Sequence, residues 1–232
     1  SAGVGTGVAV AGAGVAAGAL PATGMGAGWA DVAVDVGGDR LVGTITGLQG
    51  SVLRDVAYSA VRPARRLGAW AKLLALSAAR PDVAWTAVTL GQSRGQVEVA
   101  TIDALGPDPA TRRATAMQYL TLLVDLYRRG MCCPLPLYTA TSAAYAAAVV
   151  AGKDGALAAG REWTTTPEWT REDQDADHKL VLGGVAGIDD VLAERALADE
   201  DGDGWDPSHG RFGRYALRLW TGLLAHEQVR HG

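Results

Sequence analysis

Three positions on two adjacent predicted strands decide whether the chain could hydrolyse a phosphodiester with the help of a metal ion. They are Thr46, which ends the run Gly43-Thr44-Ile45-Thr46, and Asp55 and Ala57 on the following strand. In such a site, carboxylate oxygens hold Mg²⁺, the metal activates the attacking water, and a lysine supports it. Only Asp55 offers a carboxylate, and Ala57 cannot supply an amine. The sequence therefore predicts no working metal site, and we interpret Asp55 as a surface or ion-paired residue.

Other catalytic and cofactor patterns are missing or incomplete. The chain has no Gly-Lys-Ser/Thr, which excludes a Walker loop. Its Gly91-Gln92-Ser93-Arg94-Gly95 run lies at the predicted turn between two strands, whereas a nucleophile elbow needs a strand-to-helix turn. Residues 199–204 resemble the start of a calcium loop, but Gly210 stands where the bidentate glutamate is needed, so a disordered acidic loop is expected. In the Gly12–Val15 run, a dinucleotide-binding pattern fails because Gly18 comes one position late. We expect no cofactor and no metal ion.

A row of basic side chains follows one side of a predicted helix over residues 62–80. Leu67, Trp70 and Leu74 recur at helical spacing and form the apolar side of this helix. The opposite side has four basic residues, Arg62, Arg65, Arg66 and Lys72, which we expect to point outward together. Such a row can hold the phosphates of a nucleic acid by charge alone. The alternative is an ordinary solvated helix face.

The composition is that of a globular chain with a local charge bias. Its 232 residues are 48% hydrophobic and have a net charge of −4, which excludes full disorder and a generally basic DNA-coating protein. The two cysteines, Cys132 and Cys133, are adjacent, so no disulfide framework is predicted and a cytoplasmic location is expected. We expect both side chains to be buried. Residues 161–206 hold 14 of the 25 acidic residues. We expect residues 1–30, which are uncharged and rich in glycine and alanine, to be a connector made of a helix end and a loop.

Hydrophobic periodicity beyond residue 30 predicts the element order β-β-β-α-β-β-α-α-α. The predicted strands cover residues 32–36, 41–48, 51–59, 82–92 and 96–105. The predicted helices cover 62–80, 107–129, 141–163 and 211–229, and Gly130 is expected to cap the second. This order predicts an α/β (α+β) fold with a mixed sheet and flanking helices.

The first part of this order resembles the core of the PD-(D/E)XK, or restriction-endonuclease-like, fold. That core is a three-strand meander followed by a helix and a strand, with an aspartate on its second strand and Asp/Glu-x-Lys on its third. Thr46, Asp55 and Ala57 occupy those positions, so the catalytic residues are degenerate. We expect Leu41–Leu48 and Ser51–Ser59 to pair as antiparallel neighbours, and residues 31–232 to form one nuclease-like domain.

Longer runs of the chain resemble one family. These runs are Val61–Ser77, Ala84–Gly91, Leu122–Tyr145, His178–Gly184 and Phe212–Trp220. Within the third run, Leu-Val-Asp-Leu-Tyr-Arg-Arg-Gly followed by Pro-Leu-Pro-Leu is far more specific than a short motif. Over about residues 40–230 the chain resembles the C-terminal domain of the exodeoxyribonuclease V gamma subunit (RecC) of actinobacterial type. The family has a further helix before the first strand, where only Trp29–Asp31 stand here.

The resemblance implies a pseudo-nuclease domain that acts as a scaffold in a RecBCD-type helicase–nuclease, which repairs double-strand breaks and supports recombination. Catalysis would reside in RecB- and RecD-type subunits, which are the implied partners together with double-stranded and forked DNA, with no membrane involved. The four basic residues of the 62–80 helix are then the candidate DNA contacts. Trp163, Trp169 and Trp205 lie in loop-like sequence and are candidates for a surface that a partner covers.

Two other functions stay open at this level. The chain could be an active metal-dependent nuclease if Glu98 or Asp103 replaced the lost carboxylate beside Asp55, with a lysine nearby. It could also be a purely structural domain that contacts partner subunits and no nucleic acid. A second carboxylate next to Asp55 would favour the nuclease, and a lack of salt-dependent DNA binding would favour the structural domain.

Overall fold

The computed structural model describes residues 9–10, 28–93, 95–202 and 204–232. Its internal contacts divide the chain into two units, Ser1–Val124 together with His226–Gly232, and Asp125–Ala225. Within the described ranges, no helix combines the length and the apolar character needed to cross a membrane.

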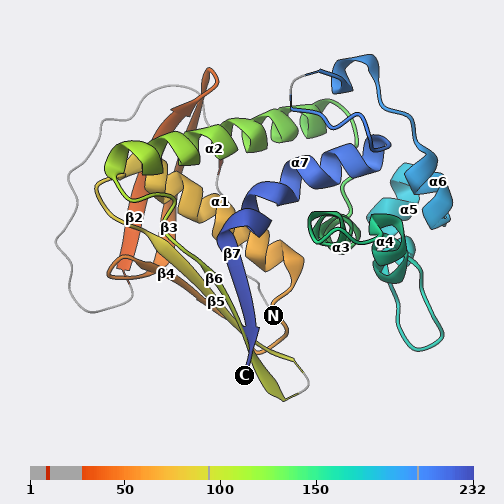
Figure 1. Cartoon of the computed structure of the whole chain (residues 1–232), viewed down its shortest axis with the longest axis horizontal. Coiled ribbons are helices and arrows are strands. Elements are labelled where there is room, and N and C mark those ends of the chain that lie inside the picture. Colours follow the sequence, from red (N-terminus) through yellow and green to blue (C-terminus); the bar gives the residue numbers. More distant parts are fainter. Residues whose placement is uncertain (1–8, 11–27, 94, 203) are drawn as a thin grey trace. The chain divides into compact units, whose positions relative to one another are not determined.

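A seven-stranded mixed sheet forms the first unit (Figure 1). Its strands are β1 (Ala9–Val10), β2 (Gly28–Val36), β3 (Asp39–Gln49), β4 (Val52–Val56), β5 (Thr86–Ser93), β6 (Gln96–Ile102) and β7 (Glu227–His231). The sheet runs in the order β2-β3-β4-β5-β6-β7, and β1 pairs with β3 on the same edge as β4. The β4–β5 pair is parallel and all other pairs are antiparallel. The predicted α/β class with a mixed sheet is confirmed.

The first three long strands form the predicted meander. Along β2, Ala30, Val32, Val34 and Val36 are buried and alternate with more exposed residues. The predicted pairing of the next two strands is confirmed, since β3 and β4 are antiparallel neighbours. Near the end of β3, Gly47 adopts a φ of +83°, and a Cβ at this position would come within 2.7 Å of the Arg54 carbonyl oxygen. Only glycine fits this bulge, where the register between β2 and β3 shifts.

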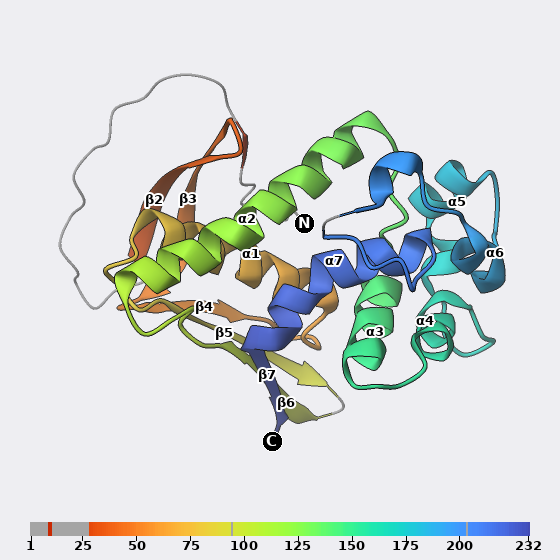
Figure 2. The same cartoon turned by 45° about the horizontal axis from the view of Figure 1, so that its top comes forward.

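Helix α1 (Pro63–Ala79) connects the parallel strands β4 and β5 and packs on β2, β4 and β5. Pro63 occupies its first turn, where a missing N–H costs nothing. Trp70, Leu73 and Leu74 are at most 1% exposed, which confirms the predicted apolar side. The Trp70 ring also contacts Tyr119, with 5.2 Å between centroids. Figures 1 and 2 show α1 along one face of the sheet.

Three predictions about helix ends and about the connector need correction. The last predicted helix, 211–229, ends at His226, and Glu227–His231 form β7 by pairing with β6. The helix predicted to stop before Gly130 continues as α2 (Pro109–Cys132), because a glycine inside a helix costs only about 1 kcal/mol. In the connector, Ala9–Val10 form β1 on β3, where a helix end was expected. The predicted loop at 21–28 and the Gly12–Gly18 run lie outside the described residues, except that Gly28 begins β2.

The second unit is helical. Its elements are the end of α2, α3 (Thr139–Val150), α4 (Gly155–Trp163), η1 (Glu172–Gln174), α5 (Ala176–Leu182), α6 (Ile188–Ala193), η2 (Ala198–Glu200) and α7 (Arg211–His226). The last residue of α7, His226, is assigned to the first unit. One aromatic-rich cluster forms the interior, with Tyr138, Trp163 and Phe212 at its centre. The Tyr138 and Trp163 ring centroids lie 4.5 Å apart.

The single helix predicted over 141–163 is two helices. The chain turns at Gly152, whose φ is +68°, a value that glycine adopts without strain. The Asp154 carboxylate then accepts a hydrogen bond from the Leu157 N–H at 3.0 Å and caps α4. The alanine-rich sequence has no apolar period that would reveal such a break. The adjacent Cys132 and Cys133, expected to be buried, are both exposed.

Candidate functional site

A hollow of about 330 Å³ opens between β3, β4 and α1 in the first unit. Thr46, Asp55, Arg65 and Lys72 all line it, so two of the predicted catalytic positions meet two of the predicted DNA contacts. Ala64 and Gly68, one helical turn apart on α1, line it too, and a Cβ at Gly68 would meet nothing within 4 Å. Small residues at this spacing keep the hollow open. The sequence analysis did not single them out, although the four-residue spacing of Ala64 and Gly68 places them on the same side of the predicted helix.

Asp55 is ion-paired with Arg65 inside this hollow. The Arg65 Nη1 lies 3.1 Å from Asp55 Oδ1 and 2.9 Å from Oδ2. Both side chains are about two-fifths exposed, so the pair is partly solvated and contributes little to stability, about 0–1 kcal/mol. Its main effect is local, because Asp55 is the only carboxylate among the described residues that line the hollow, and the guanidinium compensates it. The interpretation of Asp55 as a paired residue agrees with this geometry.

The residues of the hollow do not suit a divalent metal ion. Thr46 offers no carboxylate, and Ala57 is 8% exposed with its N–H donating to the Leu90 carbonyl at 2.8 Å. Glu98, one proposed replacement, accepts a hydrogen bond from the Val61 N–H at 3.0 Å, and neither Glu98 nor Asp103 lines the hollow. Among the described residues, no group of three or more His, Cys, Asp or Glu side chains could hold a metal.

The four basic residues of α1 fall into two groups. Arg62 is exposed, Lys72 lines the hollow, and neither has a carboxylate partner in the part of the chain that the structure describes. Arg65 is held by Asp55. The expectation that all four point outward together is wrong for Arg66, whose side chain is 17% exposed. DNA binding by any of them stays a prediction.

Arg66 is tied to the last strand of the sheet. Its Nε lies 3.0 Å from Glu227 Oε1 and 2.9 Å from Oε2, and its Nη2 also donates to Oε2. The Glu227 side chain is 2% exposed, so this carboxylate depends on Arg66 for charge compensation. The two residues are 161 positions apart, and β7 was not predicted, so no local signal in the sequence pointed to this pair.

The acidic stretch of the second unit is largely used within the fold. Glu172 accepts hydrogen bonds from the N–H groups of Ala140 and Thr141, both at 2.8 Å, and so caps α3. Asp175 accepts from the Asp177 and His178 N–H groups at the start of α5. These bonds hold the pKa of Asp175 below its ordinary value. The expectation of a disordered acidic loop at 199–204 is wrong for the described residues, because Asp199 and Asp201 bind arginines.

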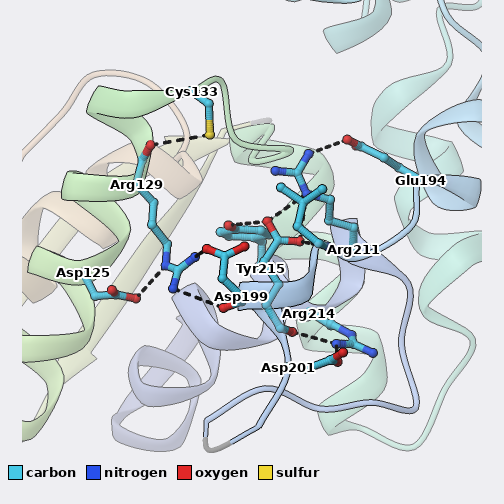
Figure 3. A network of polar contacts seen from close by, with 11 residues as sticks. Asp125, Arg129, Cys133, Glu194, Asp199, Asp201, Arg211, Arg214 and Tyr215 are labelled. Atoms are coloured by element: carbon cyan, nitrogen blue, oxygen red, sulfur yellow. Dashed lines mark hydrogen bonds and ion pairs between the residues drawn. The ribbon is translucent and has the colours of Figure 1, made fainter.

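A buried network connects this stretch to α7 (Figure 3). Arg211 donates from Nε to both Glu200 oxygens at 2.9 Å and from Nη1 to Glu194. Burial disfavours the Arg211 charge, but the bonds to Glu200 and Glu194 outweigh it and raise the pKa of Arg211. The Tyr215 hydroxyl donates to Glu200 at 2.8 Å. Burial, together with this bond to an ionised carboxylate, raises the pKa of Tyr215 to about 12. Arg211, Glu194, Glu200 and Tyr215 all have partners within the network, which indicates a structural role.

The three tryptophans predicted to lie under a partner differ in exposure. Trp163 is 1% exposed and Trp205 is 8% exposed, so both belong to the interior of the second unit. The Arg218 guanidinium carbon lies 4.5 Å from the centroid of the Trp205 ring. Trp169 is 64% exposed and alone fits the expectation.

Comparison with known proteins identifies the family. The model of the RecC C-terminal domain matches residues 13–150. The RecBCD enzyme subunit RecC of Mycobacterium tuberculosis (strain CDC 1551 / Oshkosh) is 36% identical over 199 residues, and that of Mycolicibacterium smegmatis is 34% identical over 201. Each alignment covers 85% of this chain, and the chain spans 17% of the length of each relative. By the extent of these matches, the chain belongs to the RecC C-terminal domain family.

Proposed function

We propose that this chain is a non-catalytic, DNA-handling domain of a RecBCD-type helicase–nuclease that acts in double-strand-break repair and recombination. It would work in the cytoplasm beside RecB- and RecD-type subunits, which hold the catalytic centres. The family supports this proposal, since the curated relatives bear the name RecBCD enzyme subunit RecC.

The first unit, on this proposal, is a PD-(D/E)XK-like core that has lost its catalytic residues. The order of its elements supports this, because the β2-β3-β4 meander is followed by α1 and by β5, which is parallel to β4. Thr46 and Asp55 then correspond to the metal-binding positions and line one hollow. Ala57 would stand where such an enzyme needs its lysine.

The observation that supports the proposal best is the Asp55–Arg65 ion pair in this hollow. In an active enzyme this carboxylate would bind Mg²⁺. Here a guanidinium supplies the compensating charge, and no second carboxylate stands among the lining residues that the structure describes. Lys72 adds a positive charge to the same hollow, so its chemistry suits a phosphate better than a cation.

Arg62 and Lys72 are the DNA contacts that we infer, with Arg65 as a weaker third because Asp55 already binds it. A few phosphate contacts give sequence-independent binding with a dissociation constant of roughly 10⁻⁴ to 10⁻⁶ M at physiological salt. Such contacts position a strand and do not read its bases. The second candidate is a purely structural domain, which the internal ion pairs of Arg65 and Arg66 favour.

A nuclease assay tests the non-catalytic part of this proposal. The 232-residue chain, incubated with linear and forked DNA and either Mg²⁺ or Mn²⁺, should leave both substrates intact. Cleavage that is lost in Asp55→Ala would show an active enzyme and overturn the proposal. Cleavage that persists in Asp55→Ala would point to a contaminating nuclease, which a further purification step removes before the assay is repeated.

A further inference from the structure

The second unit has a hollow of about 470 Å³ that the proposed DNA contacts do not use. The proline-rich connector between α2 and α3, including Pro134 and Leu135, contributes to its lining. Residues 181–186 contribute as well, together with the buried side chains of Tyr138 and Val191. Most of these residues are apolar, which is the composition of a site that takes apolar groups.

The chain beside this hollow exposes four large apolar side chains within six residues. Leu180 is 82% exposed, Val181 is 54%, Leu182 is 36% and Val185 is 59%. Isolated exposed apolar residues are ordinary, but a contiguous group of them marks an interaction surface. We call residues 180–185 the apolar segment.

The packing of the second unit does not account for the apolar side chains of the apolar segment. None of the seven residues of α5 is buried, and a helix this short needs packing to be stable. Three local features hold α5 in place. The Asp175 carboxylate caps its start, and Gly183 ends it with a φ of +74°. The His178 ring packs on the Tyr138 ring, with 4.8 Å between the centroids. These contacts fix the helix while leaving Leu180 and Val181 turned to solvent.

The charges around the hollow indicate what could cover it. Asp190 and Glu194 line it, and among the described residues of its lining the only cation is Arg211. Arg211 is not available to a ligand, because it is bound to Glu194 and to the buried Glu200. The lining therefore has an excess of negative charge, which repels phosphates and attracts basic groups at its rim.

We propose that the hollow and the apolar segment form the docking surface for a segment of a partner protein that presents apolar side chains flanked by lysine or arginine. The identity of that partner, a RecB- or RecD-type subunit, rests on the proposed function. The apolar side chains of the partner enter the hollow and cover Val181 and Val185. Its basic flanks lie against Asp190, the lining carboxylate that Arg211 does not bind.

The test uses the full chain with the purified RecB-type and RecD-type subunits from the same genome. Binding is measured by biolayer interferometry for the wild type and for Val181→Asp/Val185→Asp, whose residues are exposed and should not affect folding. Val150→Asp is the matched control, because Val150 is 55% exposed in the same unit and does not line the hollow. Far-ultraviolet circular dichroism and the thermal midpoint confirm that all three proteins are folded.

The proposal predicts that the double variant binds one of the subunits at least about tenfold more weakly than the wild type, and that Val150→Asp binds normally. Affinity should also fall as salt rises, and less steeply in Asp190→Asn. Wild-type binding that the double variant retains would overturn the docking surface and leave the proposed function standing. An affinity that does not change with salt concentration would overturn the part of the proposal that gives the partner segment basic flanks. No binding of the wild type to either subunit would refute the proposed partnership, and this docking surface with it.

Discussion

Replacing Arg66 by alanine should destabilise the chain strongly and leave its DNA binding almost unchanged. The change leaves the Glu227 carboxylate, which is 2% exposed, without its ion-pair partner. Removing one member of a buried ion pair costs about 3–5 kcal/mol. We expect the lower end, about 3 kcal/mol, because Arg66 is 17% exposed and water can reach the vacated space. The same change at Arg65 breaks only a partly solvated pair and should cost about 0–1 kcal/mol.

Urea unfolding of the two variants measures this difference directly. A loss of 3 kcal/mol lowers the folding equilibrium constant by a factor on the order of 100, well outside experimental scatter. Hydrogen exchange adds a local readout, since the β7 amides paired with β6 should exchange faster in Arg66→Ala. Arg66→Lys should recover only part of the stability, because lysine cannot form the same forked contact with Glu227.

The reasoning is refuted if Arg66→Ala is as stable as Arg65→Ala. It is refuted equally if Arg66→Ala keeps its stability and loses salt-dependent DNA binding. Either result would mean that the Arg66 guanidinium is exposed to solvent and is not held by Glu227 of β7.

Three further predictions concern the rest of the fold. Glu200→Ala should cost about 3 kcal/mol in urea unfolding, because the Arg211 Nε and the buried Tyr215 hydroxyl both lose their acceptor and Arg211 keeps only Glu194. Since the pKa of Tyr215 rises to about 12 in the folded chain from about 10 in the unfolded chain, the unfolding free energy should fall as pH rises from about 10 to about 12, and this decline should be shallower in Tyr215→Phe. Gly91→Ala should lower the thermal midpoint and cost about 1–3 kcal/mol, because its Cβ would lie 2.6 Å from the Ser59 carbonyl oxygen.

The parts of the fold with a clear hydrophobic period could be predicted from the sequence. β2 alternates between buried and exposed residues, and α1 has one apolar side, so both elements and the β3–β4 pairing followed from local patterns. β7 could not be predicted in this way. Its residues are polar and mostly exposed, and only the pairing with β6 makes this short segment a strand.

The sequence predicted which elements carry the residues of the candidate site, but it did not predict the ion pairs that these residues form. The sequence placed Asp55 and Lys72 on neighbouring elements, and the structure brings them to one hollow. It did not reveal that Arg66 turns to Glu227, because ion pairs between distant segments depend on the completed sheet. In the acidic stretch, Glu172 caps α3 although it lies 32 residues beyond Ala140 in the chain. The number of acidic residues in this stretch does not reveal such a distant partner.

The measurement that tests the central claim most directly is the salt dependence of forked-DNA binding by fluorescence anisotropy. Wild type is compared with Arg62→Ala/Lys72→Ala and with Lys153→Ala/Arg161→Ala, which removes the same charge from exposed positions of the second unit. The account predicts that the first double variant lowers the magnitude of the log-affinity against log-salt slope by roughly 2, about 0.9 for each lost phosphate contact, and that the second leaves it unchanged. Equal slopes for all three proteins would contradict it.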